Sequence, residues 1–309
     1  MSNSFEPQSG WALATIEGAD GDVACLETGG GLYDLSSALE AVGGEPVSGT
    51  AAVFERWQHF KPLLDKAAGA VDASMAVPAG RRKAPLPLPG KVLCAGANYY
   101  RHLEEMGVTG ATKENQRLFF FFKPPRNAVV GEGDSVHMPL DTECFDWEVE
   151  LAAVIGKRAR AVPVETALDH VAGYTVAVDF CARDLNRAPE TFYKLDWVAG
   201  KAQETCCPLG PRFVPADAIS DPQALAMRLS VNDTVKQDDT SGDMIFSIAE
   251  QISILSRIMA LDPGDVLLTG TPAGVGAARP EFLAVGDRVD AAIEGIGTLS
   301  VTIQPPKLD

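Results

Sequence analysis

The chain has 309 residues, of which 46% are hydrophobic and 22% charged, the balance of a globular protein with room for about two domains. Its formal net charge of −16 argues against a nucleic-acid partner, because phosphate binding needs a basic surface. No apolar run reaches the roughly 18 residues of a membrane span, and MSNSFEPQSG is unlike a signal peptide. Six cysteines without CxxC spacing predict reduced thiols in a cytoplasmic protein, not a cysteine zinc site.

The first 90 residues predict a small N-terminal α/β domain (1–76) followed by a linker (77–90). Within the domain, short apolar runs alternate with Gly and Asp turns, which is typical of hairpins. Residues 51–70 show helical spacing, and Pro62 should kink or divide that helix. The linker is rich in proline, which stiffens a connection rather than filling a core.

From residue 91 to 309 the pattern predicts a second, β-rich domain of the α+β class. Short apolar runs predict strands at 91–96, 117–122, 145–156, 173–180, 226–232, 265–269 and 297–303. One helix is predicted within 246–265, where Ile248, Ile252, Leu255 and Met259 recur at helical intervals ahead of a Pro-Gly pair. The glycine-dense segments lack GxGxxG spacing, which argues against a Rossmann fold.

The segment FDWEVELAAVIGK, residues 145–157, carries an acidic side chain at every second position near its start. In a strand, Asp146, Glu148 and Glu150 would share one face, and that face turns apolar further along. Carboxylates held this close suit hard cations such as Mg²⁺, Mn²⁺ or Ca²⁺. Asp179, at the end of the apolar run GYTVAVDF, is the best candidate for a third ligand. A solvated face or a protected edge strand would show the same alternation.

Six sequence blocks occur in the order seen in the fumarylacetoacetate hydrolase family, which the chain resembles from about residue 85 to 303. They are GANYYRHLEEMG, FFFFKPP, FDWEVELAAVIGK, GYTVAVDFCARDL, KAQETCCPLGP and GDVLLTGTPAGVG. The resemblance implies a mixed β-roll catalytic domain (91–309) behind a small variable N-terminal domain. It also implies a divalent cation, Mg²⁺ or Mn²⁺, a small 2-oxo or 1,3-diketo acid as substrate, and a homodimer.

Carried over residue by residue, the resemblance places the metal ligands at Glu148, Glu150 and Asp179 and a catalytic lysine at Lys201. For Asp146 it leaves two readings, a side chain that supports the ligands or a surface charge. The residues implied near the substrate are Lys123, Arg183, Thr269, Gly270 and Thr271. Arg183 could equally be structural. The family's usual Gly-Phe-Asp after the lysine is replaced by Ala-Gln-Glu. The resemblance therefore does not determine the shape of the pocket at this point.

Of the four histidines, only His102 is assigned to the chemistry. In a short helix His102 and Glu105 would share a face and hydrogen-bond to each other. Such a pair is usually a plain surface contact, but family members that hydrolyse C–C bonds carry HxxE at this place. The resemblance therefore implies that Glu105 orients His102 as a general base.

Together these expectations describe a divalent-metal-dependent hydrolase that cleaves a C–C bond in an acylpyruvate-like acid. His102 would deprotonate water, and the cation and Lys201 would stabilise the enolate that is released. Decarboxylation, isomerisation or hydration of a 2-oxo acid could use the same site. Two other classes are weighed against it: a non-catalytic binding module, and an enzyme with Cys206 or Cys207 as nucleophile, for which no base is recognisable.

Overall fold

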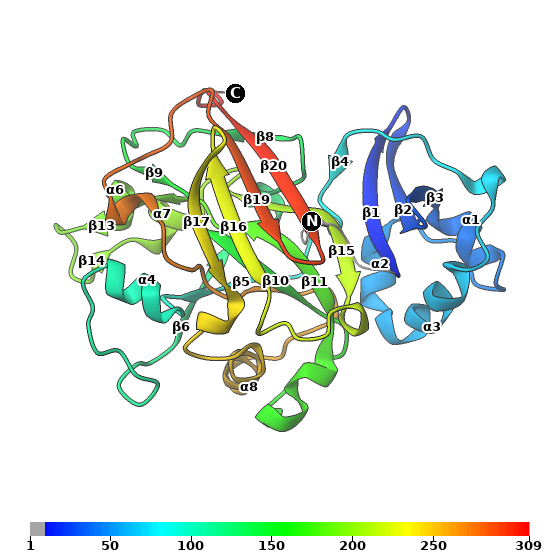
Figure 1. The fold of residues 1–309 in the computed structure, drawn as a ribbon, viewed down its shortest axis with the longest axis horizontal. Helices are drawn as coiled ribbons and strands as arrows, with labels where there is room; N and C mark the ends of the chain where they lie inside the picture. The colour runs from blue at the N-terminus through cyan, green and yellow to red at the C-terminus, as the bar shows by residue number, and fades with distance from the viewer. Residues whose placement is uncertain (1–9, 309) are drawn as a thin grey trace.

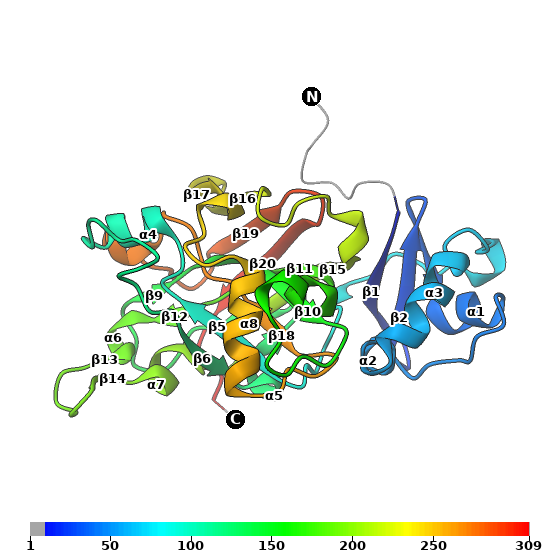
Figure 2. The ribbon, with the colours of Figure 1, turned by 90° about the horizontal axis from the view of Figure 1, so that it is seen from below.

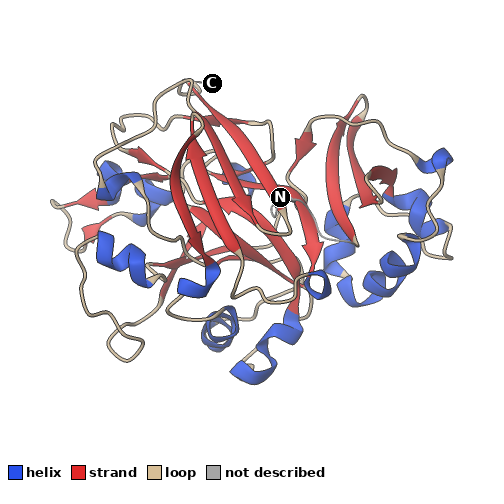
Figure 3. Ribbon diagram, in the orientation of Figure 1, coloured by secondary structure: helices blue, strands red, loops and turns tan. Residues whose placement is uncertain are grey.

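The computed structural model describes residues 10–308 and is built around two large β-sheets (Figures 1 and 3). Residues 1–9 lie outside this range. They make up most of the segment that was predicted not to be a signal peptide. The larger sheet has eleven strands; nine follow the order β3-β2-β1-β15-β11-β10-β18-β5-β6, while β4 pairs with β1 and β7 with β15. The smaller sheet has five strands in the order β17-β16-β19-β20-β8. This β-rich α+β architecture confirms the predicted fold class.

The strands of the larger sheet come from most of the chain. They are β1 (Trp11–Gly18), β2 (Gly21–Thr28), β3 (Gly31–Asp34), β4 (Arg82–Lys83), β5 (Val92–Gly96), β6 (Phe119–Lys123), β7 (Val129–Val130), β10 (Val149–Ile155), β11 (Val171–Val178), β15 (Cys207–Pro215) and β18 (Val266–Leu268). Those of the smaller sheet are β8 (Ser135–His137), β16 (Ala226–Val231), β17 (Thr234–Thr240), β19 (Arg288–Ile293) and β20 (Gly297–Gln304).

Two short strand pairs and the α-helices complete the described chain. The pairs are β9 (Phe145–Asp146) with β12 (Cys181–Ala182), and β13 (Arg187–Ala188) with β14 (Lys194–Leu195). The helices are α1 (Leu35–Glu40), α2 (Thr50–Glu55), α3 (Trp57–Ala67), α4 (Tyr100–Glu105), α5 (Pro125–Ala128), α6 (Arg183–Asn186), α7 (Trp197–Lys201) and α8 (Ile248–Ile258). Among residues 10–308, no helix is both long and apolar enough to cross a bilayer.

The main hydrophobic core lies between the two sheets. Strand β11 contacts β19 and β20, and β10 contacts β16 and β19. Leu151 and Val176 of the larger sheet belong to one buried cluster with Leu229 and Ile293 of the smaller sheet, and Ile252 of α8 closes it. Burying one such side chain contributes about 1.5–3 kcal/mol, so this cluster holds the sheets face to face.

Strand β10, which follows directly after Glu148, is buried on both faces. Leu151 and Ala153 belong to the core between the sheets, whereas Ala152 and Val154 belong to a second cluster shared with the N-terminal region. By strand alternation Glu150 lies on the same side as Ala152 and Val154. A strand enclosed in this way reads as a nearly continuous apolar run, as this one does.

The N-terminal region packs against β15 at one end of the molecule (Figures 1 and 2). Leu13 of β1 pairs with Phe213 of β15, so the hairpin strands extend the larger sheet. The rings of Phe54 and Trp57 meet Phe213 edge-on, with centroid distances of 4.8 and 5.3 Å. Aromatic contacts of this kind add to the stability gained from burial alone.

The predicted linker, residues 77–90, does more than span two units. Arg82–Lys83 form β4, which pairs with β1, and Ala84 and Leu86 are buried in the second core cluster. The segment therefore fills part of a core, contrary to the expectation from its proline content. The domain boundaries themselves stay a prediction.

Each of the seven predicted strands has a counterpart, but the strand predicted at 145–156 is interrupted. Trp147 and Glu148 lie between β9 and β10, outside both strands. The backbone N–H of Trp147 donates to the carboxylate of its neighbour Asp146 (2.8 Å). This local hydrogen bond replaces a ladder bond, which explains the interruption.

The predicted helix at 51–70 is also divided, although at Arg56 and not at Pro62. Arg56 has φ −123° and ψ 36°, and α3 continues through Pro62. A proline in a helix removes one backbone hydrogen bond, and the buried side chains Trp57, Phe60 and Leu64 hold α3 against the core.

Strands β15, β17 and β19 were not predicted. Strand β15 contains three prolines, and β17 reads TVKQDDT, so neither shows the usual apolar alternation of a strand.

Candidate active site

Three buried carboxylates, Glu148, Glu150 and Asp179, form the carboxylate cluster at the paired ends of β10 and β11. The antiparallel register sets Val149 opposite Val178, so the residue before β10 meets the residue after β11. The backbone N–H of Asp179 donates to the carbonyl of Glu148 (2.9 Å). One carboxylate oxygen from each acidic residue lies within 4.8 Å of the other two. The geometry thus brings together the three predicted ligands.

Two lysines neutralise part of the charge of this cluster. The ammonium of Lys201 donates to Glu148 Oε2 (2.7 Å) and Asp179 Oδ2 (2.9 Å). Lys123 Nζ lies 2.8 Å from Asp179 Oδ1, but its protons go to three backbone carbonyl oxygens. Within the described residues Asp179 Oδ1 therefore accepts no hydrogen bond despite being buried. An unused buried oxygen of this kind is available to a cation.

The two glutamates of the cluster differ in their partners and therefore in their acidity. Burial and the charges of Asp179 and Glu148 raise the pKa of Glu150 well above its ordinary value. Among residues 10–308 its carboxylate accepts one hydrogen bond, from the backbone N–H of Gly270 (2.6 Å). Burial opposes ionisation of Glu148 as well, but Lys201 and Arg183 lower the pKa of that carboxyl to about 2.

The carboxylate cluster fits a hard divalent cation. A bound cation would offset the repulsion that Asp179 and Glu148 exert on an ionised Glu150, and it could be bound by Asp179 Oδ1, which accepts no hydrogen bond in the described structure. Oxygen ligands alone, with no cysteine or histidine among them, suit Mg²⁺ or Mn²⁺.

A cavity of about 100 Å³ opens above the cluster. Its walls combine two of the carboxylates, cationic side chains, aromatic rings and small residues of β5. The lining residues are Ala95, Gly96, Ala97, His102, Phe119, Phe121, Glu148, Glu150, Arg183, Trp197, Lys201 and Thr271. The aromatic rings limit the space open to water and to a substrate.

Helix α4 brings His102 and Glu105 to this cavity. The predicted hydrogen bond between them is present, with His102 Nδ1 2.8 Å from Glu105 Oε1. His102 is 8% exposed and lines the cavity, so it is not the surface contact that an i,i+3 pair usually makes. The other oxygen of Glu105 accepts the backbone N–H of Gly274 (2.8 Å). With Nδ1 engaged, Nε2 is the ring nitrogen left for proton transfer.

Three of the five residues implied near the substrate do not line the cavity. Lys123 is 0% exposed beneath the cluster, and its protons are used by backbone carbonyls. The hydroxyl of Thr269 donates to Leu151 O (2.8 Å), and the N–H of Gly270 donates to Glu150. In this structure Lys123, Thr269 and Gly270 support the cluster and its strands, and their contact with a substrate stays a prediction.

Arg183 and Thr271 do line the cavity, but both are already engaged. Arg183 donates to Glu148 and to Asp146 Oδ2 (2.8 Å). The hydroxyl of Thr271 donates to Val149 O (2.9 Å) and accepts from Gln237 Nε2 (2.9 Å). Their contact with a substrate stays a prediction.

Asp146 and Gln237 are the supports that the sequence did not settle. Asp146 is 0% exposed, which excludes the surface-charge reading. Gln237 is also 0% exposed; its side chain accepts the N–H of Val149 (2.9 Å) and donates to Pro272 O (2.8 Å). It lies in the charged segment NDTVKQDDT, in which no local pattern singles out the glutamine.

The cysteines beside the cluster are poor nucleophiles. Cys206 and Cys207 are buried, and burial raises the pKa of each thiol to about 12. Nearly all of each thiol is therefore protonated near neutral pH, which argues against the cysteine mechanism.

The fold and the site define a β-rich protein with a buried carboxylate cluster that could hold a metal ion. Residues 91–304 match the family model of the fumarylacetoacetate (FAA) hydrolase C-terminal region. The chain belongs to the fumarylacetoacetate hydrolase family, as its sequence blocks implied.

Two curated relatives are oxaloacetate tautomerases. YisK of Bacillus subtilis is 42% identical over 221 residues, which cover 70% of this chain and 71% of that protein. The mitochondrial fahd2 of Xenopus laevis is 41% identical over 219 residues, which cover 70% of this chain and 66% of that protein. The matched part therefore spans about two thirds of the length of the frog relative.

Solved structures in the family include hydrolases. Fumarylacetoacetate hydrolase from Exiguobacterium antarcticum is 31% identical, with a TM-score of 0.79 over 96% of this chain and 100% of that chain. Fumarylpyruvate hydrolase from Pseudomonas aeruginosa, in complex with Mn²⁺ and pyruvate, is 34% identical, with a TM-score of 0.63 over 74% of this chain and 98% of that chain.

Proposed function

We propose that this protein is a divalent-cation-dependent enzyme that interconverts the keto and enol forms of a small 2-oxo dicarboxylic acid such as oxaloacetate. The observation that carries the proposal is the pairing of the carboxylate cluster with the hydrogen-bonded His102 and Glu105 at one small cavity. The names of the two relatives at 41–42% identity support the tautomerase reading over hydrolysis.

The cluster residues Glu148, Glu150 and Asp179 would hold Mg²⁺ or Mn²⁺. When bound, the cation would supply Lewis-acid stabilisation of negative charge on the oxygen atoms of the substrate. The Mn²⁺ in the Pseudomonas aeruginosa structure supports this assignment by analogy.

His102 is the group that would move the proton. Tautomerisation takes a proton from the carbon next to the 2-oxo group and adds one to the oxygen, or the reverse. Glu105 holds Nδ1 of His102, so Nε2 can take the proton from the substrate carbon and then deliver a proton to the 2-oxo oxygen, with the same two transfers reversed in the other direction. The carboxylate of Glu105 also stabilises the imidazolium that forms in between.

Lys201 would keep the site positively charged throughout this proton transfer. Although burial lowers it, the pKa of its ammonium is raised overall by Asp179 and Glu148, so the side chain stays protonated. Because Lys201 lines the cavity, its charge would also favour an enolate. Arg183, held by Asp146 and Glu148, is the second cation facing the cavity and is suited to a substrate carboxylate.

The lining of the cavity supports a small acidic substrate. Two cationic side chains, Arg183 and Lys201, line the space of about 100 Å³, and both are suited to negatively charged oxygen atoms.

Hydrolysis of a C–C bond in an acylpyruvate is the second candidate. The same His102 and Glu105 pair could activate water, and the fumarylpyruvate hydrolase from Pseudomonas aeruginosa supports this reading by its similarity. Decarboxylation, isomerisation of an unsaturated 2-oxo dioate and hydration would also use an enolate at the same site.

A substrate screen with Mn²⁺ and with Mg²⁺ tests the proposal. We expect the purified protein to speed the decay of the ultraviolet absorbance of enol-oxaloacetate without loss of carbon dioxide. Cleavage of acylpyruvates with oxaloacetate left unchanged would favour hydrolysis instead. A protein that binds no divalent cation at millimolar concentration and turns over none of these acids would be a binding module.

The predicted homodimer and the cytoplasmic location are part of the same proposal. Light scattering of the purified protein tests the first, and the position of a fluorescent fusion in the cell tests the second.

A further inference from the structure

Four consecutive backbone N–H groups, those of residues 274–277, donate to only two carboxylates. Gly274 and Val275 donate to Glu105, at 2.8 and 3.4 Å. Gly276 and Ala277 donate to Asp146, at 2.6 and 3.0 Å. The segment is therefore held between two negative charges that come from α4 and from β9, which are distant in the sequence.

The two carboxylates continue the connection in both directions. Glu105 binds His102, the proposed proton carrier. Asp146 binds the guanidinium of Arg183, which in turn binds the cluster residue Glu148. Side chains and four amides thus form one continuous hydrogen-bonded path from the imidazole to a metal ligand.

The same segment reaches the cluster a second time at its beginning. The N–H of Gly270 donates to Glu150 at 2.6 Å, within the same run of residues 270–277. A shift of residues 270–277 would therefore disturb the hydrogen bond to Glu150 directly. It would also disturb those to Glu105, the partner of His102, and to Asp146, which is connected to Glu148 through Arg183.

Close packing leaves the segment little freedom to move alone. A β-carbon on Gly274 would lie 2.2 Å from the carbonyl oxygen of Lys236, and one on Gly276 would lie 2.0 Å from that of Glu281. Gly274 also has a φ of +112°, a backbone angle that residues with a side chain rarely adopt. The backbone there is confined by its neighbours, so its amides are preorganised for the two carboxylates.

We infer that the segment 270–277 couples the metal centre to the His102–Glu105 pair, with Asp146 as the positioning residue that holds the segment to Arg183. Asp146 is fully buried, does not line the cavity, and uses its oxygens on three backbone N–H groups and one guanidinium. The kinetic part of this inference rests on the proposed function, whereas the part on metal affinity rests on the carboxylate cluster alone.

Calorimetric titration with Mn²⁺ of D146N, E105Q and the double variant tests the coupling. The amide in D146N keeps the size of the side chain but cannot accept from all four donors, so Mn²⁺ affinity should fall about 10–100-fold. The amide in E105Q can accept from His102 or from the segment, but not from both with full strength. Although Glu105 contacts none of the three ligands, E105Q should weaken Mn²⁺ binding about threefold or more.

The double variant separates a shared path from two unrelated defects. If both residues act through segment 270–277, the loss of Mn²⁺ affinity in the double variant should be smaller than the product of the single losses. In steady-state kinetics with oxaloacetate, both single variants should lower kcat more than they raise KM.

D265N is the matched control. Asp265 is a buried aspartate of similar surroundings, paired with Lys91 (2.6 Å) and accepting the N–H of Asp262 (2.7 Å), but it lies outside the site. D265N removes a buried carboxylate in the same way and should keep wild-type Mn²⁺ affinity. Wild-type Mn²⁺ affinity in E105Q, or losses in the double variant that multiply, would overturn the coupling. If the wild type binds Mn²⁺ but turns over no 2-oxo acid, the proposed function fails while the affinity test still stands.

Discussion

The carboxylate cluster and helix α4 face the same cavity, but different forces hold them in place. Glu150 lies within β10, while Glu148 and Asp179 directly flank the paired strands β10 and β11. The hydrogen-bond ladder of the large sheet therefore positions all three. Helix α4 has six residues and starts after Tyr99, whose side chain provides no cap. Such a short helix is not stable alone in water.

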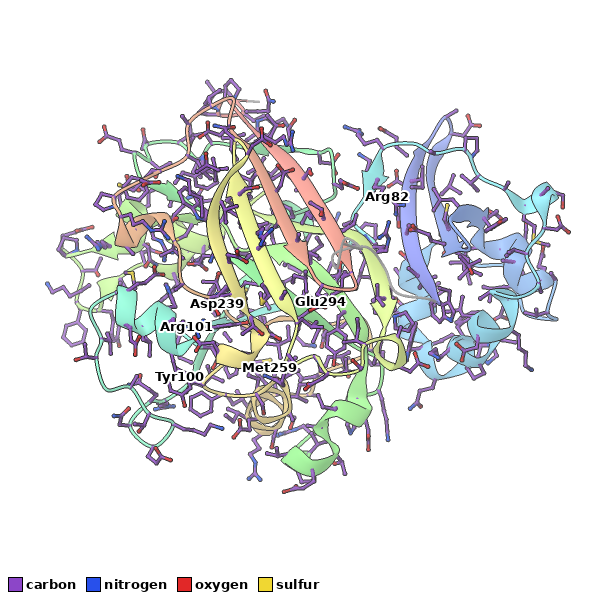
Figure 4. The ribbon with its side chains drawn as sticks, in the orientation of Figure 1. Arg82, Tyr100, Arg101, Asp239, Met259 and Glu294 are labelled. Carbon is purple, nitrogen blue, oxygen red and sulfur yellow. The ribbon has the colours of Figure 1, made fainter. Side chains whose placement is uncertain are left out.

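Side chains of Asp239 in β17 and of Asp243 in the 3-10 turn that follows it take the place of the missing cap on α4. Asp243 accepts the backbone N–H of Arg101 (2.9 Å), and the guanidinium of Arg101 reaches Asp239 Oδ1 (2.5 Å; Figure 4). Glu105 anchors the other end of α4 to Gly274. The comparison indicates that backbone pairing positions the carboxylate cluster. A few long-range side-chain contacts position helix α4 with His102 and Glu105. Substitutions should therefore separate metal binding from turnover.

The largest effect is expected for E150Q, which changes a residue of the carboxylate cluster. The change keeps the shape of the side chain but removes a ligand charge, so Mn²⁺ binding and turnover should both fall by more than about 100-fold. Calorimetry and steady-state kinetics measure the two losses. Without metal, E150Q should unfold at the same temperature as wild type or higher, since burial and Asp179 disfavour a charge there. Mn²⁺ at about 100 times its Kd should stabilise only the wild type, by about 2.7 kcal/mol.

H102A should affect turnover and leave the carboxylate cluster intact. Loss of the proton carrier should reduce turnover by about 10²–10⁴-fold. Because Glu105 can still bind residues 274 and 275, Mn²⁺ affinity should stay close to that of the wild type. Undiminished turnover in H102A would show that the assignment of His102 is wrong.

A smaller effect is expected when only the anchor of α4 is removed. D243A deletes the acceptor for the N–H of Arg101, and loss of a helix cap costs about 1 kcal/mol. Turnover should fall severalfold while Mn²⁺ affinity is unchanged. R228A is the control, because Arg228 pairs with Asp238 on the neighbouring strand and belongs to β16 rather than α4. Equal losses in both variants would mean that the anchor has no specific role.

The smallest effect concerns the thiols. Burial holds the pKa of Cys206 and Cys207 at about 12, so iodoacetamide at about pH 8 should leave both unmodified and activity intact. Because the pKa values are raised, any reaction should speed up as pH increases. Half-buried Cys144 should react first in a peptide map. Inactivation that follows modification of Cys206 or Cys207 would reopen the cysteine mechanism.

The sequence predicted the residues of the site better than their roles. ExE spacing, the Asp at the end of an apolar run and HxxE on a helix are local patterns, and each was found where it was expected. From the sequence, Lys123 is a cation near the substrate, and the structure adds that it is buried under the cluster, where it donates to backbone carbonyls. Gln237 carried no local pattern that could have identified it.

Local patterns in the sequence were thus sufficient to determine the apolar strand β10, the pairing of His102 with Glu105 and the membership of the fumarylacetoacetate hydrolase family. Only the tertiary structure decided that Asp146 is buried and bound to Gly276, 130 positions away, and that Glu105 holds Gly274, 169 positions away. The physical reason is that a backbone N–H has the same chemistry in every residue but proline. Its choice of a carboxylate partner depends on where the folded chain brings the two together.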